Sequence, residues 1–85
     1  MNMDRTIFQM NLRVEATSLY ILTCALVDQG ESATLERIRA LWNGSNEGLL
    51  NAAEELIQHG VINGTLPVEE GKPFRINPKK EWRRN

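Results

Sequence analysis

The clearest alternation of apolar and polar positions in this 85-residue chain lies between Ser45 and Gly60. Apolar side chains recur there on one side of a helical wheel, and polar side chains fall opposite them. The apolar set is Leu49, Ala52, Ala53, Leu56 and Ile57, and the polar set is Glu47, Asn51, Glu54 and Gln58. Ser45 is a favoured N-cap residue, and Gly60 can end a helix by adopting a left-handed conformation. The pattern predicts an amphipathic helix from Ser45 to His59.

Two further helical patterns precede this one. An apolar stripe that starts near Leu12 or Val14 continues through residues 19–26 and stops at Gly30. Ser32 and Thr34 are both N-cap residue types, so a second helix is expected to begin beside them. Its buried stripe is Leu35, Ile38, Leu41 and Trp42, and Asn43-Gly44 ends it. Trp42 is expected to fill the core beneath the following turn.

Both ends of the chain show the period of a β-strand. Residues 8–14 alternate apolar and polar side chains, which predicts a half-buried strand or, alternatively, an arm that merges into the first helix. After Gly60, pairing Val68 with Phe74 and Leu66 with Ile76 would place all four side chains on one face of a hairpin. We therefore expect an α+β fold of three helices and a C-terminal two-stranded β-hairpin, with a short extra N-terminal strand.

This order of elements resembles the winged helix-turn-helix family. The similarity covers residues 14–77 and is carried by Thr34-Leu35-Glu36, by the Leu-Ile-Gln-His-Gly-Val-Ile run at 56–62, and by Gly-Lys-Pro-Phe-Arg-Ile at 71–76. It divides the chain into an N-terminal arm or strand (1–13), a winged-helix domain (14–77) and a basic tail (78–85). It implies a transcriptional regulator that binds double-stranded DNA, with the third helix in the major groove and the hairpin as a wing on the backbone or minor groove. The matching positions are Ser45, Asn46, Glu47 and Asn51 on the helix, and Lys72 and Arg75 on the wing.

The charges of the chain are distributed unevenly. Residues 72–85 carry six basic side chains and one acidic side chain, a net charge of +5, whereas residues 1–71 carry four basic and ten acidic ones, a net charge of −6. Basic groups that neutralise phosphates supply much of the affinity for DNA. In the DNA-binding interpretation the phosphate contacts come from Lys72, Arg75, Lys79, Lys80, Arg83 and Arg84. Base contacts are assigned to Ser45, Asn46 and Asn51.

The third predicted helix contains no basic residue, and an acidic helix repels phosphate. This observation supports an alternative function for the same fold. In that alternative the chain is a protein-interaction module without DNA binding, and Glu47, Glu54 and Glu55 face a basic partner.

The sequence shows no nucleophile with a base at usable spacing, no glycine-rich phosphate loop and no pair of catalytic carboxylates. An enzyme and a bound cofactor are therefore not expected. His59 is the only histidine, which argues against a metal site, and Cys24 lies in an apolar run where a thiol acts as a small hydrophobe. With no secretion signal or spanning segment in the sequence, we expect a cytoplasmic protein that does not enter membranes. We also expect a homodimer formed through the N-terminal arm and the first helix.

Overall fold

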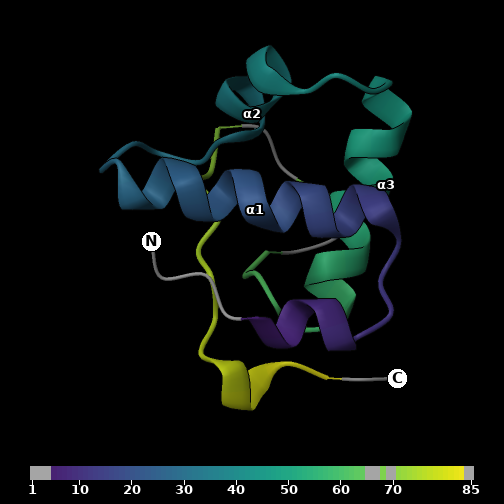
Figure 1. Ribbon diagram of the computed structural model, residues 1–85. Coiled ribbons are helices and arrows are strands. Elements are labelled where there is room, and N and C mark those ends of the chain that lie inside the picture. Colours follow the sequence, from purple (N-terminus) through teal and green to yellow (C-terminus); the bar gives the residue numbers. More distant parts are fainter. Residues whose placement is uncertain (1–4, 65–67, 69–70, 84–85) are drawn as a thin grey trace.

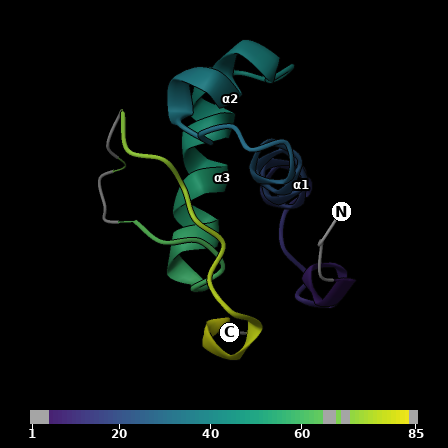
Figure 2. The ribbon, with the colours of Figure 1, turned by 90° about the vertical axis from the view of Figure 1, so that its left-hand side faces the viewer.

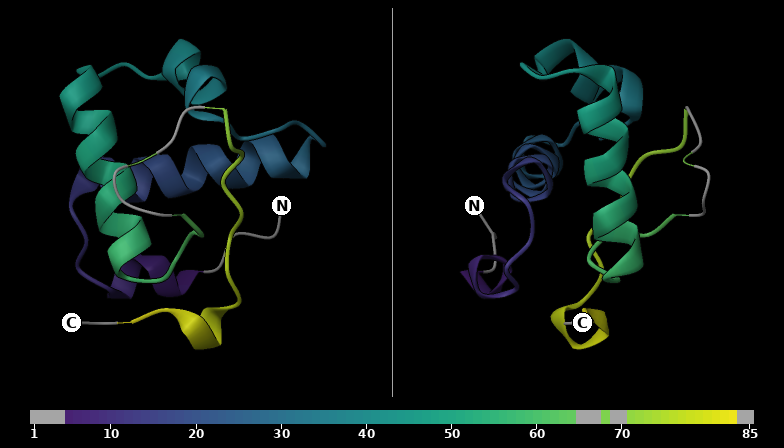
Figure 3. Two further views of the ribbon diagram at one scale, coloured as in Figure 1. Left: turned by 180° about the vertical axis from the view of Figure 1, so that it is seen from behind. Right: turned by 90° about the vertical axis from the view of Figure 1, so that its right-hand side faces the viewer.

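The computed structural model describes residues 5–64, 68 and 71–83 (Figure 1). Its elements are the 3₁₀ helix η1 (Arg5–Gln9), the α-helices α1 (Val14–Asp28), α2 (Leu35–Leu41) and α3 (Asn46–Gln58), and the 3₁₀ helix η2 (Lys79–Glu81). Helices α1 and η1 lie on one side of α3, and the extended C-terminal segment lies on the other side (Figure 2). Seen from behind, the same segment crosses α1, and α3 lies beside this crossing (Figure 3, left).

The three α-helices lie where the sequence predicts them, but Leu41, expected in the buried stripe of α2, is 51% exposed. Helix α1 packs against α3 with a buried face made by Ala16, Leu19, Tyr20, Thr23, Cys24 and Leu26. The Thr23 hydroxyl donates a hydrogen bond to the Leu19 carbonyl at 2.8 Å, so this buried polar group is satisfied within its own helix. Gly30 ends the turn after α1 with φ of 77°, the left-handed conformation that favours glycine.

Two N-caps fix where α2 and α3 begin. The Thr34 hydroxyl accepts the Arg37 N–H at 3.2 Å, and the Ser45 hydroxyl accepts the Gly48 N–H at 3.0 Å. Each cap satisfies one of the backbone donors that a helix start leaves unpaired. Trp42 packs against the core as predicted, and its indole Nε1 donates to the Ser45 carbonyl at 3.2 Å. The tryptophan therefore ties the turn between α2 and α3 to the start of α3.

The predicted N-terminal strand is wrong, because residues 5–9 form η1. Ile7 and Met10 are buried three residues apart, which is the repeat of a 3₁₀ helix, while Phe8 is 54% exposed. Asn11, with φ of 57°, then turns the chain toward α1. Residues 5–9 therefore form a helical turn, because that conformation buries both Ile7 and Met10, and the alternating pattern does not produce a strand.

The predicted C-terminal β-hairpin, and with it the α+β fold class, is also wrong. The residues that the structure describes contain no β-strand, and their β-pairing is a single isolated antiparallel bridge between Ile62 and Ile76. Leu66, the expected partner of Ile76, lies outside these residues. On either side of the bridge, the Asn63 N–H donates to the Arg75 carbonyl at 3.0 Å and the Asn77 N–H donates to the Val61 carbonyl at 2.9 Å. The protein is therefore a three-helix fold with an extended C-terminal segment rather than a winged one.

The physical reason for this pairing is visible in two contacts. Val61 and Ile62, directly after α3, are almost fully buried, so the returning chain meets them in the core. Phe74, expected opposite Val68, instead donates its N–H to the Ala33 carbonyl in the loop before α2, at 2.9 Å. The returning segment is thus held by the core and by that loop.

The last described residues fold back onto the body of the protein. The rings of Trp82 and Tyr20 meet edge to face, with centroids 5.6 Å apart, and the Trp82 indole donates to the Asn77 carbonyl at 2.9 Å. An aromatic pair of this geometry adds stability beyond the area it buries. Residues 78–83 therefore belong to the folded unit. In the described part of the chain, no helix has the length and apolar character needed to span a bilayer.

Candidate interaction surfaces

The outer side of α3 carries a row of polar side chains, here called the α3 ridge: Glu47, Asn51, Glu54 and Gln58. All four are exposed, while the opposite side of the helix is buried against the core. In the right view of Figure 3, no other element lies in front of α3. Among the residues described, neither Glu47 nor Glu54 has a hydrogen-bond or ion-pair partner. The ridge therefore presents two uncompensated carboxylates on a rigid helix.

Glu55 lies at the edge of the ridge and is half-buried. Its carboxylate oxygen Oε2 accepts the Arg13 backbone N–H at 3.3 Å, a weak contact that joins α3 to the residue before α1. A shallow polar depression is lined here by Arg13, Asn51, Glu54, Glu55, Gln58 and His59. Of the three predicted interaction carboxylates, two stand on the ridge and the third faces this depression.

Two of the three predicted base-contacting residues use their side chains in hydrogen bonds within the fold. The Ser45 hydroxyl caps α3, and the Asn46 side-chain oxygen Oδ1 accepts the Arg39 Nε–H at 2.9 Å. Asn51 is exposed, and it stands between Glu47 and Glu54 on the ridge. A DNA base approaching Asn51 would also bring its phosphates close to both carboxylates, which is electrostatically unfavourable.

The predicted phosphate-binding residues lie along the C-terminal segment. Lys72, Arg75, Lys79 and Lys80 are exposed along this segment, and we call them the C-terminal strip. In the left view of Figure 3 this segment crosses α1, and α3 lies to its left. Glu81 is the one acidic residue among residues 72–83. Arg84 lies outside the described residues.

Arg83 does not extend from the body as a free basic group. Its guanidinium Nη2 donates to the Gln58 carbonyl at 2.7 Å, and its backbone N–H donates to the His59 carbonyl at 2.6 Å. The Arg83 carbonyl lies 2.6 Å from His59 Nδ1, and because a carbonyl can only accept, Nδ1 carries the proton in this contact. Arg83 therefore binds the C-terminal end of α3, at the opposite end of the helix from Ser45 and Asn46.

The docking of this segment was not predicted from the sequence. It depends on Gly60, where an added Cβ would lie only 2.5 Å from the Glu81 carbonyl oxygen. Trp82 is the residue from which this docking could have been predicted. Its large ring lies within a run of charged residues, and burying such a ring against the body of the protein is favourable.

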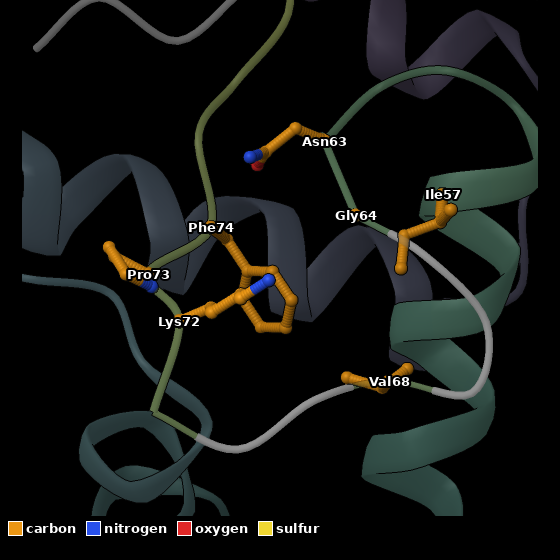
Figure 4. A pocket seen from close by; sticks show the side chains of 7 residues that line it. All are labelled: Ile57, Asn63, Gly64, Val68, Lys72, Pro73 and Phe74. Carbon is orange, nitrogen blue, oxygen red and sulfur yellow. The ribbon is translucent and has the colours of Figure 1, made fainter.

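A small cavity of about 240 Å³ lies between α3 and the returning chain. It is lined by Ile57, Asn63, Gly64, Val68, Lys72, Pro73 and Phe74, as Figure 4 shows. Its wall is mainly apolar. Lys72 is the ionisable residue among these lining residues, and none of them carries a carboxylate, imidazole, thiol or hydroxyl group.

Among the described residues, no three His, Cys, Asp or Glu side chains are grouped so that they could hold a metal ion. Burial raises the pKa of the Cys24 thiol, a hydrogen bond with Tyr20 opposes this effect, and the nearby Asp28 charge adds to it. The thiol is therefore a weak nucleophile in the folded state.

Comparison of the chain with protein-family models, with curated proteins and with solved structures gave no match. The winged helix-turn-helix resemblance therefore rests on the sequence pattern alone.

Proposed function

We propose that this protein is a small non-catalytic binding module whose α3 ridge docks a basic surface of a protein partner. The observation that carries the proposal is the exposure of Glu47 and Glu54 on one side of α3, where neither carboxylate forms an ion pair with a described cation. Asn51 and Gln58 lie in the same row and supply neutral hydrogen-bonding groups.

The ridge is preorganised for a partner because the other side of α3 is fixed. Leu49 and Ala53 are fully buried, and Leu56 is buried beside them, so α3 cannot rotate without opening the core. From residue 47 to residue 58 the ridge is about 16 Å long at the usual helical rise. A partner helix with Lys or Arg at every third or fourth position would match that length.

Exposed ion pairs are individually weak, at about 0.2–1 kcal/mol each. Charge complementarity of this kind mainly accelerates association and selects the partner, and it weakens as salt screens the charges. We therefore expect modest affinity with a strong dependence on ionic strength.

Binding of a helical peptide with lysines at the matching spacing tests this function, with titration calorimetry as the readout. Glu47→Lys together with Glu54→Lys should abolish binding. Glu15→Lys is the matched control, because Glu15, like Glu47, is exposed in the first turn of a helix but lies on α1. Equal binding by the wild type and the ridge double variant would refute the proposal.

Binding of duplex DNA is the second candidate function, favoured by the exposed cations of the C-terminal strip. In this case the strip, together with Arg84, contacts phosphates, as in a transcriptional regulator. Glu54→Lys separates the two functions, because it should weaken capture of a basic peptide and strengthen binding to DNA. Titration with duplex DNA at low salt tests this second candidate, and the absence of salt-sensitive affinity would exclude it.

A further inference from the structure

We infer that two copies of this chain associate through the outer side of α1, with the two α1 helices packed antiparallel. The contact does not depend on the proposed function, because it uses a different helix from the α3 ridge. Three properties of α1 carry it: an uncharged sequence, an open side and a pattern of side chains that matches itself.

Helix α1 is uncharged over most of its length. No Asp, Glu, Lys or Arg lies between Glu15 and Asp28, whereas α3 places Glu47 and Glu54 on its outer side. A surface helix usually carries charged side chains on the side that faces water, and a helix that is apolar all round is usually buried all round. The sequence of α1 therefore fits a helix that is covered on both sides.

The fold covers only one side of α1. Its buried side packs against α3, and in Figure 1 no other helix of the described chain lies in front of it. On the outer side Val14 is 79% exposed. Four further outer residues are partly exposed and follow at helical spacing, and with Val14 they are here called the α1 face: Ser18, Ile21, Leu22 and Ala25.

The lack of charge on the α1 face favours a second copy as its partner. In a two-fold dimer a surface contacts the same surface of the other copy, so a charged patch would meet its own charge. The α1 face avoids this repulsion, and the formal net charge of −1 for the whole chain adds little at long range. An antiparallel arrangement also places the positive end of each helix dipole beside the negative end of the other.

The side chains of the α1 face are complementary to themselves in that arrangement. When two helices pair antiparallel about a centre between Ile21 and Leu22, Ser18 of one copy lies opposite Ala25 of the other, because both are equally far from the centre. Two small side chains that face each other let the helix axes approach closely. Ile21 and Leu22 can then pack against the same residues of the second copy, which removes their exposed parts from water.

The size of the face sets the strength of the contact. Helix α1 has 15 residues. At the usual rise and width of a helix, this length corresponds to a strip of about 22 Å by 10 Å. Stable complexes bury about 800 Å² on each partner, and a single helix face of this size supplies less. We therefore expect a weak dimer that forms below about 1 mM protein.

Sedimentation velocity of the full-length chain tests the inference. Between about 10 µM and about 1 mM the wild type should pass from monomer to dimer. Ala25→Glu should raise the dissociation constant at least about tenfold, because it buries a carboxylate in an apolar contact. Ala40→Glu is the matched control: Ala40 is exposed on α2, and the substitution adds the same charge outside the α1 face. This control should associate like the wild type.

A mixture of two variants tests the antiparallel arrangement. Ala25→Glu chains mixed with Ser18→Lys chains should associate more tightly than Ala25→Glu chains alone, because the new carboxylate and ammonium lie opposite each other. Circular dichroism checks that each variant is folded. Ala25→Gln replaces Ala25→Glu if the latter unfolds, and it should also weaken association because a longer side chain keeps the helices apart.

Physiological salt should leave the association unchanged, since salt screens charges and does not weaken apolar contacts. A wild type that stays monomeric at about 1 mM overturns the inference, as does equal association of folded Ala25→Glu and Ala40→Glu chains. Association that disappears when salt is added also overturns it, because that result indicates contacts between charged surfaces. A mixture that associates no better than Ala25→Glu alone refutes the antiparallel pairing.

Discussion

Replacing Gly60 with alanine tests whether the C-terminal segment is an integral part of the fold. Gly60 follows α3 with φ of 72°, a conformation in which an L-residue is strained by about 1–2 kcal/mol. At this position an added Cβ would also lie 2.5 Å from the Glu81 carbonyl oxygen. Because the clash is with backbone, it cannot be relieved by turning a side chain, and the segment around Glu81 has to move.

The cost of that movement can be worked out from the contacts that follow Glu81. Arg83 makes three hydrogen bonds to residues 58 and 59, through its guanidinium, its N–H and its carbonyl. Such bonds contribute about 0.5–1.5 kcal/mol each, and a shift of the segment would break some or all of them. With the backbone strain included, Gly60→Ala should destabilise the protein by about 2–5 kcal/mol.

Gly30→Ala is the matched control. Gly30 has nearly the same backbone conformation, with φ of 77°, but no other atom lies within 4 Å of its added Cβ. It should therefore cost only the backbone strain, about 1–2 kcal/mol. Urea unfolding followed by circular dichroism gives both values. In a chain that ends at residue 78 the two substitutions should cost the same, and equal costs in the full chain would refute the docking argument.

Three other predictions concern the core and the helix start. Trp82→Ala should cost about 1–3 kcal/mol in urea unfolding because it uncovers Tyr20, whereas Trp82→Phe should keep most of the stability; equal losses would count against the ring contact. Ser45→Ala should cost about 1 kcal/mol by removing the bond to the Gly48 N–H, without changing peptide affinity at the ridge. Cys24 should react with a thiol reagent at pH 8 far more slowly in native than in urea-unfolded protein. Since its pKa is raised by folding, this thiol should also make stability fall as pH rises above its ordinary value of 9.0, and Cys24→Ala should remove that part of the pH dependence.

The sequence predicted the helices because their signals are local. Thr34 and Ser45 act as N-caps where their residue types suggested, and Gly60 adopts the left-handed conformation expected of it. A cap or a helical stripe is decided by residues within one or two turns, so a single sequence contains the needed information.

The sequence did not predict the pairing of the returning chain, because that pairing is decided by distant residues. The hairpin argument used the side-chain faces of residues 66–76, which are consistent with a local turn. In the structure Ile76 lies opposite Ile62, and Phe74 bonds to Ala33, about forty residues away in the sequence. Neither partner could be chosen from the alternation of apolar and polar residues alone.

The position of the C-terminal residues changes what the charge distribution of the chain can do. From the sequence, the basic residues of the tail were expected to contact phosphates. The structure instead binds Arg83 to the end of α3 and bonds residues 74–77 to Ala33 and to residues 61–63, so the described cations are held in place relative to the ridge carboxylates. A long polyanion such as DNA that follows the strip toward α3 would meet Glu47 and Glu54, whereas a protein surface with both signs of charge can satisfy strip and ridge together. This fixed separation of charges is the physical reason for placing a protein partner before DNA.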